Sequence, residues 1–254
     1  MRSYSSARLF YVTKGQGRIT IAGLTSGYGP NNLIFIPANT MFGYEIGTMV
    51  FGQMLTIPNS MASDWPETTA HLRLRDVVAQ KELQSQFDSI EKELKSTGQT
   101  HSRAAMYQLG LLSVFFERQL AAAPDQATAA RAQTSAARLV AAYADLIERD
   151  FSKGFGVSHY AKMLGVTPTH LTRCCNQTCQ KSALALLHNR VHFEACELLR
   201  ETNLPINKIA TQLGFRSAAY FARDFTTKSG ACPTAFRKFG NAATTTQQIG
   251  NTRF

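Results

Sequence analysis

Residues 161–165, AKMLG, return 49 positions later as residues 210–214, ATQLG, and each copy lies between two short helical patterns. The stretch PTHLTRCCNQTCQ (168–180) follows the first copy, and SAAYFARDFTTKSG (217–230) follows the second. In both copies the alanine permits two helices to cross closely, and the glycine suits a turn residue with left-handed backbone. The repeat therefore predicts two helix-turn-helix units in one chain.

The segments around the repeat complete this pattern. Thr167, followed by Pro168, and Ser217 are residue types that cap helix N-termini. Residues 182–201, SALALLHNRVHFEACELLRE, form one long helical pattern between the two units. Such a helix would hold the units rigidly, so that their second helices enter successive major grooves about 34 Å apart.

The basic charge of the chain is concentrated in the same region. The formal net charge is +10. Residues 1–135 hold 12 Lys and Arg against 10 Asp and Glu, whereas residues 151–240 hold 12 against 4. A net charge of +8 over ninety residues indicates a polyanionic partner, and double-stranded DNA is the partner that two helix-turn-helix units predict.

The overall composition is that of a globular protein. Of the 254 residues, 44% are hydrophobic and 17% are charged, and no apolar run approaches the length of a membrane span. The N-terminal stretch MRSYSSARLFYVTKG lacks the features of a signal peptide. With five cysteines and no export signal, we expect reduced thiols, a cytoplasmic location and no membrane partner.

A family resemblance follows from the second unit. Residues 189–238, NRVHFEACELLRETNLPINKIATQLGFRSAAYFARDFTTKSGACPTAFRK, resemble the C-terminal signature of AraC/XylS-type transcription regulators. The matching positions are Arg190 and Ala195 of the linker helix, Ile209-Ala210, Gly214-Phe215, Tyr220-Phe221-x-Arg223-x-Phe225, and Gly230-x-x-Pro233-x-x-Phe236-Arg237. The resemblance is specific over about residues 155–240. More loosely, YVTKGQGRITI and NNLIFIPANTMFGYEIG resemble the cupin-like sensing domain of many members.

The residues that would contact base edges lie early on each second helix. In the first unit the candidates are Thr169, His170, Thr172, Arg173 and Asn176. In the second unit they are Arg216, Ala218, Ala219, Tyr220 and Arg223. Arginine can bind guanine through two hydrogen bonds, whereas alanine offers only an apolar contact to a thymine methyl. We therefore expect the second unit to discriminate less among sequences. The alternative for Arg223 is a salt bridge within its own helix.

Other cations are better suited to phosphates, which position a protein on DNA without specifying the sequence. The candidates are Lys162, Lys181, Lys208, Lys228, Arg237 and Lys238. The alternative for each of them is a solvated surface charge.

Three cysteines within residues 174–179 raise the question of a metal site or a redox switch. Cys175 aligns with Phe225 of the second unit, so we expect a small buried core residue there. Cys174 aligns with Asp224 and is expected at the periphery, and Cys179 lies near the helix end, where Gln180 replaces the glycine usual in the family. No second ligand cluster accompanies them, so no metal is expected. A redox role would require an exposed thiolate of low pKa.

The first half of the chain predicts a different fold. Strand patterns occur at residues 9–13, 18–21, 33–36 and 48–57, while residues 23–32 are rich in turn residues. Short strands at this spacing indicate an antiparallel barrel or sandwich, and the cupin resemblance implies a small barrel. Residues 67–96 and 101–122 have helical periodicity and would form a hairpin. This hairpin would mediate a homodimer, as in family members, or pack on its own barrel.

The barrel offers a candidate pocket but no catalytic site. Residues 1–60 contain no histidine, and Phe42 occupies the position where a cupin histidine would follow the proline turn. We therefore expect no enzyme activity and no cofactor. The candidate effector-pocket residues are Phe10, Phe35, Phe42, Tyr44, Phe51 and Met54, which would otherwise simply fill the core.

The sequence thus predicts an α+β protein with four segments. They are a cupin-like sensing and dimerisation domain (1–123), a linker (124–137), an all-α double helix-turn-helix domain with a long linker helix (138–240), and a disordered tail (241–254). The predicted function is sequence-specific transcription regulation, with a small-molecule effector and RNA polymerase as further partners. A non-specific architectural DNA-binding protein and a cupin-type enzyme with a DNA-binding module are the alternatives.

Overall fold

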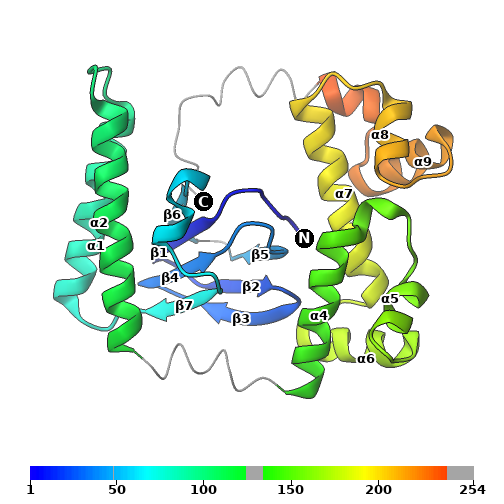
Figure 1. The fold of residues 1–254 in the computed structure, drawn as a ribbon, viewed down its shortest axis with the longest axis horizontal. Coiled ribbons are helices and arrows are strands. Elements are labelled where there is room, and N and C mark those ends of the chain that lie inside the picture. The colour runs from blue at the N-terminus through cyan, green and yellow to red at the C-terminus, as the bar shows by residue number, and fades with distance from the viewer. Residues whose placement is uncertain (48, 124–133, 239–254) are drawn as a thin grey trace.

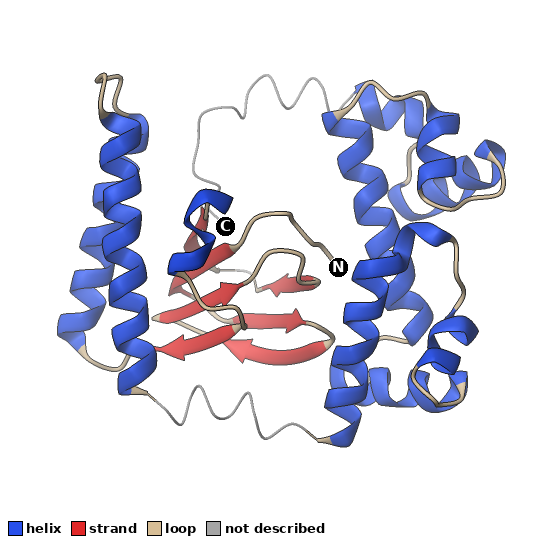
Figure 2. Ribbon diagram, in the orientation of Figure 1, coloured by secondary structure: helices blue, strands red, loops and turns tan. Residues whose placement is uncertain are grey.

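The computed structural model describes residues 1–47, 49–123 and 134–238 of the chain. Two β-sheets lie in the middle of the molecule (Figure 1), with the paired helices α1 and α2 on one side and the helical C-terminal half on the other. Figure 2 shows the same separation, since the strands lie between two groups of helices. Within the described ranges, no helix is both long and apolar enough to span a membrane.

The N-terminal half contains two antiparallel sheets. The first has the order β6 (Phe51–Thr56), β1 (Arg8–Lys14), β4 (Asn32–Ile36), β7 (Ala70–Arg73). The second has the order β3 (Leu24–Tyr28), β2 (Gly17–Ile21), β5 (Phe42–Ile46). The predicted closed barrel is therefore wrong. Closure requires hydrogen bonds between edge strands, whereas β3 and β5 pair in these sheets only with β2.

The four-stranded sheet is buried on both faces, and successive side chains along its strands point alternately to one core and to the other. Leu9 and Tyr11 of β1 belong to the core beneath α1 and α2, whereas Phe10 and Val12 belong to the core between the sheets. Strand β4, NLIFI, follows the same alternation and is buried at all five positions. The sheet thus contributes side chains to two separate cores, one on each of its faces.

The helical hairpin is confirmed, but its first helix begins later than predicted. Helix α1 spans Val77–Lys95 and α2 spans His101–Ala122. Residues 70–73 form β7 instead, since they pair with β4 in antiparallel register. The side chain of Asp76 accepts a hydrogen bond from the Ala79 backbone N–H at 3.0 Å, which caps α1 at its observed start. A short 3-10 helix, η1 (Asn59–Asp64), precedes β7.

The turn-rich segment 23–32 also contains a strand that the sequence pattern did not predict. Ala22 and Gly23 have φ values of 48° and 77°, as in a two-residue hairpin with left-handed turn residues. This turn places β3 directly beside β2, with Ile21 opposite Leu24. The small and polar residues of β3 obscured its strand pattern.

All secondary-structure elements in the described part of the C-terminal half are helices, which are joined by short loops. Helix α4 (Ser135–Asp150) leads through the single turn η2 (Phe151–Lys153) into the first unit, α5 (Val157–Met163) and α6 (Pro168–Cys179). The long helix α7 (Ala183–Glu201) then leads to the second unit, α8 (Ile206–Gln212) and α9 (Ala218–Ser229). Of the predicted linker, residues 124–133 lie outside the described residues, as does the predicted tail, and α4 begins at Ser135.

The two halves are in contact. Met41 belongs to the same buried cluster as Val140 of α4. At the end of α6, Arg18 donates a hydrogen bond to the Gln180 side chain at 3.2 Å. A T-shaped ring pair, with centroids 5.4 Å apart, joins Tyr4 to Phe193 of α7. The C-terminal half thus shares packed surface with the sheets, a feature that the sequence pattern did not predict.

A buried arginine connects the helices of the C-terminal half. Arg190 on α7 is only 4% exposed. Its guanidinium donates two hydrogen bonds to Glu148 of α4, at 2.7 and 3.0 Å, and one to Glu194 at 2.9 Å. It also lies 3.9 Å from the ring centroid of Phe151. A buried charge with this many partners holds α4, η2 and α7 in one arrangement.

We expect Arg190→Met to lower the free energy of unfolding by about 3 kcal/mol, because it leaves two partly buried carboxylates without their cation. Arg200→Ala is the matched control on the same helix. Its side chain is 43% exposed and pairs with Glu197 at 3.5 Å, so its loss should cost about 1 kcal/mol or less. Urea denaturation followed by circular dichroism measures both. Equal losses in the two variants would contradict a structural role for the Arg190 pair.

Candidate nucleic-acid interface

The two helix-turn-helix units have the same turn geometry. In the first, the backbone N–H of Val166 donates to the Ala161 carbonyl at 3.0 Å, and in the second Phe215 donates to Ala210 at 2.9 Å. The turn glycines also match, with φ values of 68° at Gly165 and 76° at the corresponding glycine of the second unit. The predicted repeat is therefore confirmed at the level of individual hydrogen bonds.

Both predicted helix caps are also confirmed. The Thr167 side chain accepts from the backbone N–H of His170 at 3.2 Å, and the Ser217 side chain accepts from Tyr220 at 3.2 Å. At the opposite ends, Gln180 (φ 55°) and Gly230 (φ 74°) occupy the left-handed conformation after α6 and α9. The caps set the start of each second helix, and hence which of its side chains reach solvent.

The first unit exposes a polar surface at the start of α6. Thr169, Arg173 and Asn176 are exposed, and His170 and Thr172 are half-buried. The Arg173 guanidinium lies 3.0 Å from Nδ1 of His170 on the preceding turn. The five candidates therefore lie on or beside one solvent-facing surface, and their assignment to base contacts stays a prediction.

The second unit exposes a less polar surface. Arg216, Ala219 and Arg223 are exposed, Ala218 is half-buried, and Tyr220 is 61% exposed. The ring of Tyr220 lies beside that of Phe215, with centroids 6.0 Å apart. Among the ion pairs of residues 1–47, 49–123 and 134–238, none involves Arg216 or Arg223. In the described structure, Asp224 pairs instead with Lys228, at 2.7 Å, so the salt bridge considered for Arg223 does not form.

The phosphate candidates differ in how accessible they are. Lys162, Lys208 and Lys238 are exposed. Lys181 faces the sheets and lies 3.6 Å from the Glu45 carboxylate. Arg237 is half-buried and donates to the Leu204 carbonyl at 2.6 Å, while Lys228 is paired as described above. Contacts from Lys162, Lys208 and Lys238 require no rearrangement, whereas the other three candidates would first lose an internal partner.

The cysteines of α6 are core residues. Cys175 is fully buried, as predicted, and Cys174 and Cys179 are each 4% exposed, so the peripheral position expected for Cys174 is wrong. Burial raises the pKa of the Cys175 thiol to about 12 and also raises that of Cys179. The Cys179 thiol donates to the Cys175 carbonyl at 3.2 Å. A redox switch needs an exposed thiolate of lowered pKa; all three thiols are buried, and the pKa values of Cys175 and Cys179 are raised.

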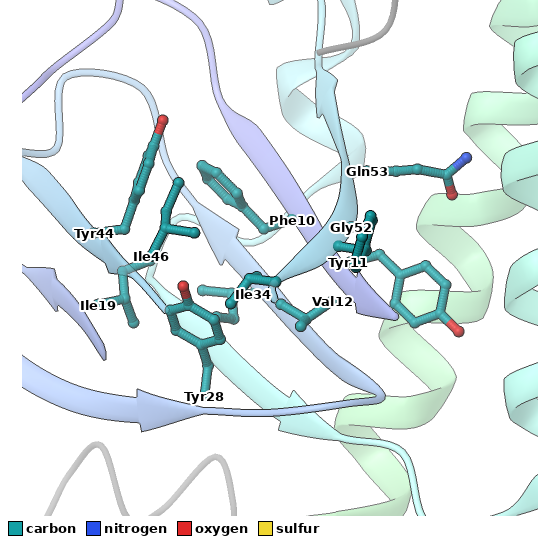
Figure 3. A pocket seen from close by; sticks show the side chains of 12 residues that line it. Phe10, Tyr11, Val12, Ile19, Tyr28, Ile34, Tyr44, Ile46, Gly52 and Gln53 are labelled. Atoms are coloured by element: carbon teal, nitrogen blue, oxygen red, sulfur yellow. The ribbon is translucent and has the colours of Figure 1, made fainter. Parts of the chain in front are cut away.

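A small cavity lies between the two sheets of the N-terminal half. Its volume is about 30 Å³, which is room for one or two water molecules. In Figure 3, Phe10, Tyr28, Ile34 and Tyr44 surround it, whereas the side chains of Tyr11 and Gln53 point away from it. The Tyr28 hydroxyl already donates to the Glu45 carbonyl at 3.2 Å. The wall of the cavity is almost entirely apolar.

Only half of the predicted pocket residues line this cavity. Phe10, Tyr44 and Phe51 do so. Phe35 points to the opposite face of its sheet and stacks on Trp65, with ring centroids 5.5 Å apart. Phe42 and Met54 belong to the core between the sheets but not to the cavity wall. Among the wall residues that the sequence pattern missed are Ile19, Tyr28 and Ile34; recognising the β2–β3 hairpin would have indicated Tyr28.

The first histidine of the chain lies on a strand rather than in the predicted helix. His71 on β7 bonds through Nε2 to the Asn32 side chain at 2.7 Å, and burial lowers its pKa. Within the described ranges, no group of three or more His, Cys, Asp or Glu residues could hold a metal ion. His71 is accounted for by its contacts within the sheet.

Two family models match the chain, one for each half. The model described as "AraC-like ligand binding domain" matches residues 2–112, and the model described as "Helix-turn-helix domain" matches residues 160–238. Among curated proteins, an uncharacterized HTH-type transcriptional regulator, YfiF of Bacillus subtilis (strain 168), is 33% identical over 91 residues. That match spans 36% of this chain and 29% of the relative.

Solved structures of similar proteins resemble either one half or most of the chain. The C-terminal domain of AraT, a response regulator from Geobacillus stearothermophilus, is 28% identical, with a TM-score of 0.40. That match covers 46% of this chain and 92% of the domain. Unsaturated fatty acid bound wild-type ToxT from Vibrio cholerae is 12% identical, with a TM-score of 0.44. It covers 92% of this chain and 87% of ToxT.

Proposed function

The chain belongs to the AraC/XylS-type transcriptional regulators, and on this premise we propose that it binds a promoter sequence of two unequal half-sites. The first half-site would be contacted by α6 and the second by α9. Phosphate contacts from exposed lysines would position both units on the duplex. RNA polymerase is the partner through which regulation of this kind would act.

One observation carries this proposal. Two units with the same turn hydrogen bonds and the same helix caps expose Arg173 on α6 and Arg223 on α9, and neither arginine has an ion-pair partner among the described residues. A guanidinium that no carboxylate neutralises can bind a guanine through two hydrogen bonds, and for Arg173 this contact would compete with the one to His170. The net charge of +8 over residues 151–240 supplies the attraction to the DNA backbone.

The two recognition helices differ in what they can specify. Around Arg173, α6 exposes threonine, histidine and asparagine side chains, each of which forms hydrogen bonds. On α9, Ala218 and Ala219 offer only methyl groups, and Tyr220 adds one hydroxyl and an aromatic face. We therefore assign most of the sequence selectivity to the first unit.

We expect Arg173→Ala to weaken binding by about 1–3 kcal/mol and to relax selectivity at one base position. Selection of bound duplexes from a randomised pool, followed by sequencing at near-physiological salt, measures the change. Lys208→Ala is the control, because the loss of a phosphate contact should weaken all sequences equally and lower the salt dependence. A uniform loss in Arg173→Ala would reassign that residue to a phosphate.

The same selection separates this proposal from an architectural role. An enriched motif with two blocks about one helical turn apart supports the regulator. DNA that is retained without any motif, with an affinity that falls steeply with salt, would instead indicate non-specific binding.

The proposed effector site is the cavity between the two sheets. Its wall is almost entirely apolar, and its two tyrosine hydroxyls already have partners: Tyr28 donates to Glu45, and Tyr44 accepts from Arg2. A ligand of metabolite size needs roughly ten times the volume that is open here. Binding would therefore have to displace aromatic side chains. An apolar effector would suit the site best, because it has the fewest polar groups to remove from water on entering.

We expect isothermal titration against a panel of small apolar metabolites to find a compound that binds the unaltered protein. Val12→Phe adds volume at a residue that lines the cavity and is 7% exposed, so it should abolish the heat of binding while DNA binding persists. No heat for any candidate, or unchanged binding in Val12→Phe, would count against an effector in this cavity.

A second copy of the chain is the partner that we propose for the helical hairpin. Helix α2 buries Leu109, Leu112 and Phe116 against the sheet. On its outer surface Tyr107, Leu111 and Val114 are 68%, 59% and 41% exposed. Residues spaced by four and three form one apolar stripe along a helix, which suits packing against the same stripe of another copy.

We expect Leu111→Glu to shift a dimer of the full chain toward monomer by tenfold or more, because it places a charge in the apolar contact. Val78→Glu is the control, since Val78 is 71% exposed and lies in the first turn of α1, the other helix of the hairpin. Sedimentation velocity over a range of micromolar concentrations measures both. Dimers that survive Leu111→Glu unchanged would place the interface elsewhere.

A further inference from the structure

The turn of the second helix-turn-helix unit touches the segment that leads into the first unit, and the contact is between the backbones of two glycines. Gly154 follows η2, just before the first unit, and Gly214 lies in the turn of the second unit. A Cβ atom built on Gly154 would lie 2.5 Å from the Gly214 carbonyl oxygen, and one built on Gly214 would lie 2.3 Å from the Gly154 nitrogen. Both neighbours are backbone atoms, so no side-chain rotation can relieve the overlap. Any residue larger than glycine at either position must push the two units apart.

Comparison with the first unit separates this contact from the requirements of the turn. Gly165 occupies the same place in its own turn and has φ +68°, against +76° for Gly214. A Cβ atom on Gly165, however, would meet nothing within 4 Å. The left-handed backbone therefore explains a glycine in both turns, while the close contact with the other unit exists only at Gly214.

The surroundings of this joint, defined as Gly154 and Gly214, make it the place where the units are fixed relative to each other. Phe151 and Val191 pack against the cores of both units. Figure 1 shows the two units side by side along α7, with α5 and α6 toward one end and α8 and α9 toward the other. Beside the joint a groove of about 630 Å³ is lined by α7, by the segment that leads into the first unit (151–156) and by the second unit. The second unit is therefore separated from this segment along the groove and meets it closely at the joint.

We propose that the contact between Gly154 and Gly214 sets the distance and rotation between the two recognition helices, and so determines which spacing of half-sites the protein accepts. This inference rests on the bipartite DNA binding proposed above. B-form DNA completes a turn in about 10–10.5 base pairs, so each inserted base pair rotates the second half-site by roughly 35°. A rigid joint cannot follow that rotation, whereas a displaced joint selects a different spacing.

The test compares operators whose spacers are shortened or lengthened by one or two base pairs. Gly154→Ala and Gly214→Ala alter the joint. Gly165→Ala and Gly230→Ala are the controls, since both glycines have positive φ and nothing within 4 Å of an added Cβ. The controls reproduce the backbone strain without the overlap. Circular dichroism shows whether each variant folds. The two joint positions lie in different segments, so the test can be made with either variant if the other fails to fold.

We expect the unaltered protein and both controls to lose affinity on the order of tenfold when two base pairs are inserted. In the joint variants the preferred spacing should shift, or the loss should fall below about threefold. Joint variants with the same spacing profile as the controls would overturn the proposal. If the unaltered protein shows no sequence preference at all, the proposal of sequence-specific DNA binding fails. That result differs from equal spacing profiles in all variants, so the failure of one proposal can be told from the failure of the other.

A measurement without DNA tests the joint directly. Spin labels on Cys232, which is exposed, and on Met163→Cys, which places a thiol on the exposed surface of the first unit, report the distance between the units. The other four cysteines are buried and should remain unlabelled in the native protein. We expect a shifted or broadened distance distribution in Gly154→Ala and Gly214→Ala, and an unchanged one in Gly165→Ala. Identical distributions in all variants would show that the glycines do not fix the units.

Discussion

The arrangement of the C-terminal half depends on one buried guanidinium. Arg190 bonds to a carboxylate on α4 and to another on α7, and it lies against the ring of Phe151 between them. A charge that is 4% exposed is tolerated only with such partners. The ion pair therefore couples the orientation of α7 to that of α4. Both helix-turn-helix units are attached to α7. The Arg190 contacts therefore also determine how the two units are presented to DNA.

The cores of the two units have residues of different size at equivalent positions. At equivalent positions, Cys175 and Phe225 are both buried to 1% exposure or less. In the first unit, Cys175 shares its buried cluster with Tyr143 of α4, which is fully buried and donates to the Ala183 carbonyl at 2.9 Å. The sulfur-rich stretch of α6 is thus part of a closely packed core.

The sensing half and the DNA-binding half are physically linked. Arg18, Glu45 and Tyr4 contact residues at the end of α6 and on α7, and Glu45 also accepts from Tyr28 at the cavity wall. A side chain displaced in the cavity is therefore two contacts away from the end of the first recognition helix. This short path gives an effector a physical route to the DNA-binding surface, provided that the contacts differ between bound and free states.

The sequence by itself determined the features that depend on neighbours within a few residues. The caps at Thr167 and Ser217, the left-handed turn glycines and the helical periods follow from backbone geometry over one or two turns, and the structure has them as predicted. Tertiary structure decided the rest. Residues 70–73 became a strand because β4 was available to pair with them, and the sheets stayed open because their edges found no partners in each other. Likewise, Phe35 and Cys174 are placed by what packs on their sheet or helix, and the contact between Gly154 and Gly214 joins segments sixty residues apart. No local pattern encodes such contacts, because their free energy arises only once distant segments have come together.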